Sequence, residues 1–404
     1  MMNKNINIIF VTDLHVESLG GGKGGRAFYN TLKLYIDAGW NISLITTGGG
    51  VPKEFLNNIN VFEAHFPSPK NKWCFPIYVF EKWLYYKRSF SFYTNNIKSI
   101  LDKNSSNTLI YAYEVGGVLA AKRASVKYNV PLVTRFQGTV HTHTKNTLIN
   151  RLKYFPFLQS LGTTADVVIM TNDGTMGDKV LARLNNKTSK INFWMNGVSV
   201  PKEDELNERD QYREKFGFGN KIIYLTVSRL VSWKKVERAL FAFSKVISSI
   251  PNAELHICGD GEERERLEQL SKSLNISQSV VFHGSIPHVD VSKYMMASDI
   301  FLSLYDLSNV GNPLLEAMSY GKSIITLDNG DTSRFIIDGK NGYCIPCSNL
   351  ELIPTLMLSL ALDSAKRIEL GNKARLFAIN NFWSWNDRMN EELKVVSNLI
   401  DYKA

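Results

Sequence analysis

Short apolar strands alternate with amphipathic helical segments along the whole chain. The first half has five such strands, at Asn7–Thr12, Ile42–Thr46, Leu109–Tyr113, Pro131–Thr134 and Val167–Met170. The second half has five more, at Ile222–Ser228, Glu254–Cys258, Ser279–His283, Ile300–Leu304 and Ser323–Leu327, with helices such as Val236–Ile250 and Glu262–Leu274 between them. This alternation predicts parallel sheets built from strand–helix–strand units, and therefore an α/β protein.

A length of 404 residues suits two domains, each large enough for its own core. The polar run at Asn196–Glu205, with Gly197 and Pro201, predicts a connector between two similar halves. We expect a domain at residues 1–198, a second at 199–384, and a final segment, 385–404, that returns to the first domain. Ligands of such sheets bind beyond the carboxyl ends of the strands, so two stacked domains would share a central cleft.

The composition, 44% hydrophobic and 21% charged residues, is that of an ordinary globular protein. No apolar run approaches the roughly 18 residues of a membrane span, and Ile8–Val11 is too short for a signal-peptide core. We therefore expect a cytoplasmic chain. The net charge of +9 is unevenly shared, because residues 1–200 contain 23 Lys and Arg against 11 Asp and Glu.

Basic and aromatic residues are mixed between His65 and Lys98, where Glu81 is the single acid. Six cations lie there together with eleven aromatic residues, among them Trp83 and Tyr86. Such a mixture favours peripheral contact with an anionic membrane, or with an anionic acceptor, through residues 65–98. The alternative is an aromatic core helix pair with a solvated lysine face. No nucleic-acid motif is present, so we expect no nucleic-acid partner.

The segment Ser308–Met318 follows an apolar strand and opens a helix. Gly311 and Asn312 allow a tight turn, and Pro313 suits the first helical position. A helix start leaves backbone N–H groups without partners and favours a phosphate. Glu316, one turn inside, would present a carboxylate to sugar hydroxyls. A diphosphate linked to a sugar fits both features, although a buried strand–helix corner whose Glu caps a neighbour fits equally well.

Two further basic side chains stand near a strand end. Arg229 follows the strand Ile222–Ser228, and Lys234 comes five residues later. Both would converge on a diphosphate and neutralise charge on a leaving group.

The glycines at 20, 22 and 25 match G-x-G-x-x-G, but an acid is missing at the end of the second strand, so an NAD oxidoreductase is not favoured. Gly24 and Gly25 remain as a flexible backbone surface that a substrate can approach.

Several spaced motifs resemble those of retaining nucleotide-sugar glycosyltransferases with the two-domain GT-B fold, of the glycosyl transferases group 1 type. Ser228-Arg229-Leu230 with Lys234 is similar to G-R-L-x-x-x-K, and the stretch from Asn309 to Gly321 is similar to E-x-F-G-x-x-x-x-E-A-M-x-x-G. The other matching elements are Gly24-Gly25, Ala38-Gly39, Ala165–Val168, Asn196–Val198, Gly259–Gly261, Ser298–Phe301, Asp338-Gly339 with Asn341-Gly342, and Phe382–Trp385.

The chain departs from the family pattern at a few positions. Ser308 stands where the family has the first Glu of its double-carboxylate motif, and Asp306 is a nearby carboxylate that would substitute for it. Val310 holds the family's Phe position, and Gln137-Gly138 stands where many members have His-Gly. Gln137 would donate a hydrogen bond to a sugar hydroxyl but cannot act as a base.

The resemblance implies two Rossmann-like domains and sugar transfer from a nucleotide diphosphate, UDP by family habit, with retention and without a metal. Arg229 and Lys234 would stabilise the leaving group, and Glu316 would bind the ribose. The donor-binding residues would be Ser228, Arg229, Lys234, Gly259, Asp260, Ser308, Asn309, Val310, Gly311, Asn312, Pro313, Leu314 and Glu316.

The acceptor, a glycan or lipid-linked glycan of cell-surface polysaccharide biosynthesis, would bind the first half at Gly24, Gly25, Glu114, Arg135, Gln137 and Gly138. Pairing of Glu114 with Arg135 across neighbouring strands is an equal alternative for those two residues. A non-catalytic scaffold of polysaccharide assembly and a nucleotide-sugar epimerase of the same fold remain as alternative functions.

Overall fold

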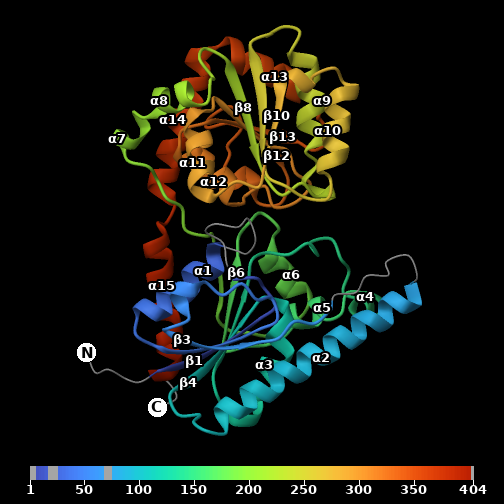
Figure 1. Ribbon diagram of the computed structural model, residues 1–404, viewed down its shortest axis with the longest axis vertical. Coiled ribbons are helices and arrows are strands. Elements are labelled where there is room, and N and C mark those ends of the chain that lie inside the picture. The colour runs from blue at the N-terminus through green and yellow to red at the C-terminus, as the bar shows by residue number, and fades with distance from the viewer. Residues whose placement is uncertain (1–5, 17–25, 68–74, 402–404) are drawn as a thin grey trace. The chain divides into compact units, whose positions relative to one another are not determined.

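The computed structural model describes residues 6–16, 26–67 and 75–401 and contains two parallel sheets, each flanked by helices (Figure 1). By their contacts the residues form two units. Unit 1 comprises Met1–Thr171, Gly177–Trp194 and Asn386–Ala404, and unit 2 comprises Asn172–Met176 and Met195–Trp385. The predicted α/β class with two Rossmann-like domains is confirmed, and the predicted shared cleft stays a prediction.

The sheet of unit 1 has seven strands in the order β3-β2-β1-β4-β5-β6-β7, and all its paired strands run parallel. Its strands are β1 Asn7–Thr12, β2 Asn41–Thr46, β3 Ile59–Glu63, β4 Thr108–Tyr113, β5 Leu132–Phe136, β6 Val167–Thr171 and β7 Ile191–Trp194. The central strands coincide with the predicted ones. The edge strands β3 and β7 were not predicted, since their partly exposed residues lack a continuous apolar run.

Helices cover both faces of this sheet. Helices α1 (Arg26–Asp37) and α15 (Trp385–Asp401) supply buried residues to one core. The other core is built with α2 (Phe75–Leu101), α3 (Val115–Tyr128), α5 (Phe157–Leu161) and α6 (Gly177–Arg183). The short helix α4 (Leu148–Lys153) contributes no buried residue, and a 3-10 turn η1 lies at Lys53–Phe55.

The sheet of unit 2 has six parallel strands in the order β10-β9-β8-β11-β12-β13. They are β8 Ile222–Val227, β9 Ala253–Cys258, β10 Val280–Gly284, β11 Ile300–Ser303, β12 Ser323–Asp328 and β13 Tyr343–Pro346. Five of them match the five predicted strands, and β13 is a further, four-residue strand at the edge of the sheet. Its Cys344 is buried at the strand, and Cys347 beyond the strand is exposed.

One face of the second sheet packs against α9 (Glu237–Val246), α10 (Arg264–Ser273) and α13 (Leu352–Leu362). The other face packs against α11 (His288–Ala297), α12 (Asn312–Ser319) and α14 (Ser364–Asn381). The remaining short elements are α7 Glu203–Leu206, α8 Arg209–Lys215, and the 3-10 turns η2 Ser232–Lys234, η3 Ser277–Ser279 and η4 Thr332–Arg334.

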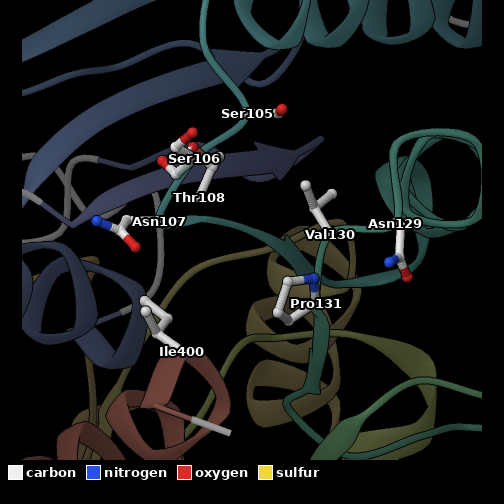
Figure 2. Close-up of a pocket in the computed structure, with 8 residues that line it drawn as sticks. All are labelled: Ser105, Ser106, Asn107, Thr108, Asn129, Val130, Pro131 and Ile400. Atoms are coloured by element: carbon white, nitrogen blue, oxygen red, sulfur yellow. Dashed lines mark hydrogen bonds between the residues drawn. The ribbon is translucent and has the colours of Figure 1, made fainter. Parts of the chain in front are cut away.

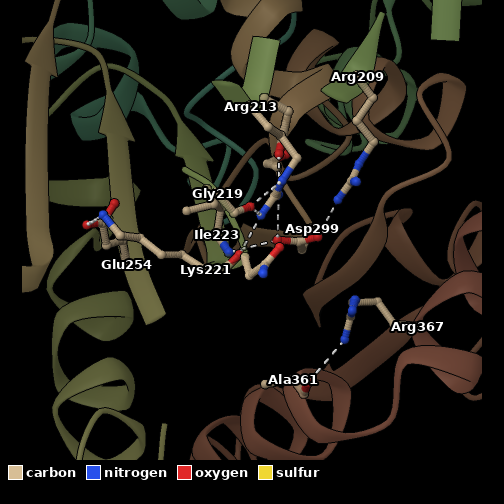
Figure 3. A network of polar contacts seen from close by, with 12 residues as sticks. Arg209, Arg213, Gly219, Lys221, Ile223, Glu254, Asp299, Ala361 and Arg367 are labelled. Carbon is tan, nitrogen blue, oxygen red and sulfur yellow. Dashed lines mark hydrogen bonds and ion pairs between the residues drawn. The ribbon is translucent and has the colours of Figure 1, made fainter. Parts of the chain in front are cut away.

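A carboxylate at the entry to β11 fixes α8 onto this sheet (Figure 3). Asp299 accepts hydrogen bonds from Arg209 Nη2 at 2.7 Å, from Arg213 Nη1 at 3.1 Å and from the amide of Ile223 at 2.8 Å. The buried Arg213 also donates to the carbonyls of Gly219 and Lys221. The Ser298-Asp299 element of the sequence is therefore a structural clamp in this chain.

A second buried charge network ties α15 to the first sheet. Glu392 is fully buried and accepts hydrogen bonds from Arg135 Nη1 at 2.8 Å, Arg388 Nη1 at 2.9 Å and the Tyr111 hydroxyl at 2.7 Å. The two guanidinium groups, themselves buried, lower the pKa of Glu392 against the opposing effect of burial. One carboxylate therefore compensates two buried cations.

We expect Glu392→Gln to destabilise unit 1 by about 3 kcal/mol, because removing one partner of a buried pair leaves uncompensated buried charge. Urea denaturation followed by circular dichroism measures the loss. The matched control is Glu391→Gln on the same helix, whose carboxylate lies 3.7 Å from Lys394 near the surface and should contribute less than about 0.5 kcal/mol. Equal transition midpoints for the two variants would refute the role given to Glu392.

Candidate functional site

Two loops pack edge to edge at the carboxyl ends of β8 and β9. The amide of Ser228 donates to the Cys258 carbonyl at 3.0 Å, and that of Leu230 donates to the Asp260 carbonyl at 2.9 Å. A Cβ on Gly259 would lie 1.8 Å from the Ser228 carbonyl oxygen, and Gly259 has φ +140°. Glycine is thus required here so that the backbone can approach the turn that carries Arg229.

Lys234 and Arg229 are positioned by the loop after β8. Lys234 ends the 3-10 turn η2, and its Nζ donates to the Ser308 carbonyl at 3.2 Å. The same ammonium lies over the rings of Tyr305, at 4.1 Å, and Trp233, at 4.5 Å. Arg229 is exposed, with its guanidinium 5.8 Å from the Trp233 ring centre. The structure therefore brings both predicted cations to one edge of the sheet, against the loop that carries Ser308.

Burial and two neighbouring charged groups act on the pKa of Lys234. Burial lowers the pKa of Lys234 to about 7. The Asp173 carboxylate opposes this effect by raising the pKa of Lys234, whereas the neighbouring Arg229 guanidinium lowers it further. A dianionic ligand placed beside these cations would favour the protonated ammonium.

Asn309 shapes the loop between β11 and α12. Its Oδ1 accepts from the Tyr305 amide at 3.1 Å and from Ser303 Oγ at 3.0 Å, and its Nδ2 donates to the Tyr305 carbonyl and to Asn329 Oδ1. The side chain is 1% exposed. The hydrogen bonds of the Asn309 side chain therefore hold the loop, and donor binding at this residue stays a prediction.

The start of α12 offers fewer backbone donors than the sequence suggested. Pro313 has no N–H, and the amide of Leu314 donates to the Gly311 carbonyl at 3.0 Å. The side chains of Val310 and Leu314 are each 1% exposed and belong to the core. These two side chains therefore pack in the core, as a backbone role for this segment allows, and the amides of Gly311 and Asn312 remain as candidate phosphate donors.

Glu316 lies one turn inside α12, as predicted, and is mostly buried. Its Oε1 is 2.8 Å from Nε2 of His288, the first residue of α11. The contact orients the carboxylate, and His288 is a site residue that the sequence reasoning missed. The sequence offers only a small indication of this role for His288, because Pro287-His288 opens a helix directly after the strand β10.

Two carboxylates, those of Asp306 and Asp173, lie near the site, where Ser308 stands at the position of the family's first Glu. The Asp306 carboxylate pairs with Arg238 Nη2 at 2.6 Å and lies 4.0 Å from Lys235 Nζ. It therefore binds basic side chains at the start of α9. Asp173, in the segment Asn172–Met176 of unit 2, accepts a hydrogen bond from the Ser308 side chain and acts electrostatically on Lys234. Asp173 is therefore the carboxylate that contacts the Ser308 side chain, and the role expected for Asp306 stays a prediction.

The segment that carries Asp173 is closely packed. Thr175 donates to Asp173 Oδ1 through its hydroxyl at 2.6 Å and its amide at 3.2 Å. A Cβ on Gly174 would lie 3.0 Å from the Val310 side chain, and one on Gly330 would lie 1.7 Å from the Gly174 carbonyl oxygen. Burial raises the pKa of Asp173, while Thr175, Ser308 and Lys234 lower it. No motif in the sequence distinguishes this aspartate from a turn residue.

The predicted acceptor residues of unit 1 lie after β4 and β5. Glu114 has φ 63° directly after β4, and its Oε1 accepts from the amide of Gln137. Gln137 Nε2 in turn donates to the Tyr113 hydroxyl, and Gly138 follows with φ +112°. Glu114 and Gln137 thus meet at the carboxyl ends of adjacent strands. Gly24 and Gly25 lie outside the described residues.

Arg135 is not an acceptor-binding residue. Its side chain is 0% exposed and pairs with Glu392 within the sheet–α15 core, not with the Glu114 side chain as the alternative reading had it. The strand β5 extends to Phe136, beyond its predicted end, and this places Arg135 within the sheet.

Asp13, just beyond β1, was not predicted. Its carboxylate accepts a hydrogen bond from the Gly116 amide at the start of α3, and burial raises its pKa.

Among the described residues, a pocket lies apart from these loops, whereas a metal-ligand cluster and a membrane-spanning helix are absent. A shallow pocket lies at the amino ends of β4 and β5 (Figure 2), lined by Ser105, Ser106, Asn107, Thr108, Asn129, Val130, Pro131 and Ile400. Within the described ranges, no three His, Cys, Asp or Glu residues gather as a metal ion would require. No helix in that part of the chain is long and apolar enough to span a membrane.

Comparison with known proteins gives relatives of one kind. The model of the family described as "Glycosyl transferases group 1" matches residues 208–377. A GDP-mannose-dependent alpha-(1-6)-phosphatidylinositol monomannoside mannosyltransferase of Mycolicibacterium smegmatis is 24% identical over 239 residues, which span 57% of this chain and 62% of that protein. An uncharacterized glycosyltransferase of Haemophilus influenzae is 24% identical over 90% of this chain and 93% of its own length.

Among solved structures, Anabaena HepE in complex with UDP and glucose has a TM-score of 0.73 at 16% identity and covers 97% of this chain and 100% of its own. The likeness extends over both sheets, and the family match covers the strands and loops that carry Arg229, Lys234 and Glu316. This chain therefore has the GT-B fold, and residues 208–377, within its second unit, match the model of the glycosyl transferases group 1 family.

Proposed function

We propose that this chain is a retaining glycosyltransferase that moves a sugar from a nucleotide diphosphate to a glycan or lipid-linked glycan acceptor. The observation that carries the proposal is the meeting of Lys234, the Ser308 loop and the start of α12 at one edge of the second sheet. HepE, which shares the fold, binds UDP and glucose, which supports a UDP-sugar as donor. The M. smegmatis relative uses GDP-mannose, so guanosine donors belong in the same test.

The chemistry of the site suits a diphosphate leaving group. When the glycosidic bond to the diphosphate breaks, negative charge grows on the departing phosphate oxygen. Lys234 and Arg229 neutralise that charge, and the amides of Gly311 and Asn312 donate hydrogen bonds to the phosphate. Glu316, oriented by His288, accepts hydrogen bonds from the ribose hydroxyls.

Retention follows a front-face route in this proposal. The acceptor hydroxyl attacks the anomeric carbon on the side of the departing diphosphate, and its proton passes to a leaving phosphate oxygen. No side chain then has to act as a nucleophile or general base. The two cations and the backbone amides take the electrostatic role that a divalent ion would have, so transfer is expected to continue in the presence of a chelator.

The acceptor is proposed to bind unit 1 near Glu114, Gln137 and Gly138. The relative from M. smegmatis is named for transfer to a mannosylated phosphatidylinositol, which supports a lipid-linked glycan. A role in cell-surface polysaccharide synthesis at the inner face of the cell membrane agrees with that chemistry.

A panel of UDP- and GDP-sugars, incubated with and without lipid-linked acceptors, tests the proposal. Transfer releases nucleotide and lengthens the acceptor, and NMR of the new anomeric proton gives its configuration. An isomerised donor would indicate an epimerase instead. Neither product across the panel, despite donor binding detected by thermal shift, would indicate a non-catalytic scaffold.

Arg229→Ala and Lys234→Ala should each lower kcat by more than about tenfold, because each removes a charge that stabilises the leaving group. Steady-state kinetics of nucleotide release measure the loss, and circular dichroism verifies folding. Lys235→Ala is the matched control, since its ammonium lies 3.9 Å from Glu237 and 4.0 Å from Asp306. Wild-type turnover in the first two variants would remove them from the site.

The affinity for a nucleotide sugar should fall as the pH rises above about 7, where free Lys234 loses its proton. The loss should approach about tenfold per pH unit, because the bound diphosphate selects the protonated amine. Calorimetry with UDP-glucose and GDP-mannose between about pH 6 and about pH 9 measures it, since their diphosphates stay ionised throughout.

Two variants check the assignment of this titration. Lys234→Arg should flatten the profile because a guanidinium keeps its proton over the whole range. Asp173→Asn should move the loss to lower pH, since the Asp173 carboxylate raises the pKa of Lys234. A wild-type profile in Lys234→Arg would show that another group titrates.

A further inference from the structure

Exposed apolar side chains are concentrated on two helices of unit 1. On α2, Ile77, Val79, Phe80 and Trp83 are 47–60% exposed, and on α4, Leu148, Ile149 and Leu152 are 69–76% exposed. We call these seven residues the α2–α4 face. Since α4 buries none of its residues, packing within the described chain does not explain its three large aliphatic side chains.

The two helices are held side by side (Figure 1). Lys82 Nζ donates to the carbonyl of Lys153, the last residue of α4, at 3.4 Å. The ring of Tyr86 packs edge-on against Phe155 with 4.7 Å between centroids. Val79, Trp83 and Tyr86 follow one another at helical spacing, so the exposed stripe of α2 borders directly on the side that contacts the end of α4. The two apolar sets therefore lie on neighbouring helices that contact each other.

The charge around this surface is almost entirely positive. Residues 64–101 contain six Lys and Arg and the single acid Glu81, and residues 115–165 contain six Lys and Arg besides the buried Arg135 and no acid. Lys87 lies over the Trp83 ring at 5.0 Å, and Lys153 lies over the Tyr154 ring at 5.1 Å. Of this set, residues 68–74 lie outside the described part of the chain.

We propose that the α2–α4 face docks on an anionic lipid bilayer, with Leu148, Ile149 and Leu152 of α4 inserted beside the aromatic stripe of α2. Aliphatic side chains suit the acyl boundary, tryptophan suits the headgroup level, and surrounding lysines attract anionic lipid. A soluble acidic partner would match the charge but not so many exposed apolar side chains. The inference adds α4 to the segment expected from the sequence and does not depend on sugar transfer.

Flotation of the full chain with vesicles tests the proposal. The wild type should bind vesicles of phosphatidylcholine mixed with phosphatidylglycerol, and bind vesicles of phosphatidylcholine alone at least about tenfold more weakly. The triple variant Leu148→Gln, Ile149→Gln, Leu152→Gln should lose at least about tenfold in binding to the anionic vesicles, because the inserted apolar area is gone.

The matched control is Leu362→Gln, Ile368→Gln, Leu376→Gln in unit 2, whose side chains are 58–71% exposed. This control should bind as the wild type does. A second variant, Lys82→Gln, Lys87→Gln, Lys153→Gln, should retain its fold by circular dichroism and lose the dependence of binding on salt.

Two results would overturn the proposal. One is equal flotation of the wild type and the α4 triple variant. The other is self-association of the wild type in sedimentation, abolished in that variant, without vesicle binding, which would assign the face to a second copy of the chain. Since vesicle binding is measured without a sugar donor, failure of transfer and failure of docking are distinguishable.

Discussion

The parallel direction of the strands in unit 2 is the constraint on which the candidate site depends. All six strands end at the same edge, so the loops after β8, β9 and β11 meet although they are far apart in sequence. The turn at Gly259 then fixes the loop of Arg229, because its backbone approaches Ser228 more closely than any side chain would allow. The positions of Lys234 and of the start of α12 follow from that packing and from the hydrogen bonds of the Asn309 side chain. They do not depend on contacts with a ligand.

The electrostatics of the site are arranged to favour an anion. Lys234 has lost much of its hydration, and its hydrogen bond to the Ser308 carbonyl is a weaker compensation than a carboxylate partner would be. Arg229 adds positive charge nearby, and Asp173 opposes it only in part. In unit 1, by contrast, Arg135 and Arg388 both pair with the buried carboxylate of Glu392. Arginine therefore stabilises the fold in unit 1, as Arg135 and Arg388, and is available for binding in unit 2, as Arg229.

Much of this arrangement could be predicted from the sequence, for physical reasons that also explain the failures. Buried central strands such as β1 and β8 form continuous apolar runs, whereas β3 and β7 alternate exposed and half-buried residues and do not stand out. Glu316 follows a helix-start pattern and was predicted as such. The roles of Arg135 and Asp173 depend on partners 257 and 135 residues away, Glu392 and Ser308, and no local pattern encodes a contact of that kind.

The basic excess of the first half divides into two kinds of charge with different consequences. Arg135 is buried and paired with Glu392, so it is not part of the exposed basic surface. The lysines of α2 and α4 lie near the surface beside exposed aromatic and aliphatic side chains, with Glu81 as the single acid in both segments. Charge of this second kind acts over about one Debye length and is screened by salt, while apolar contact is not. A surface that combines the two is suited to an anionic interface, where attraction from solution comes first and burial of the apolar side chains retains the protein.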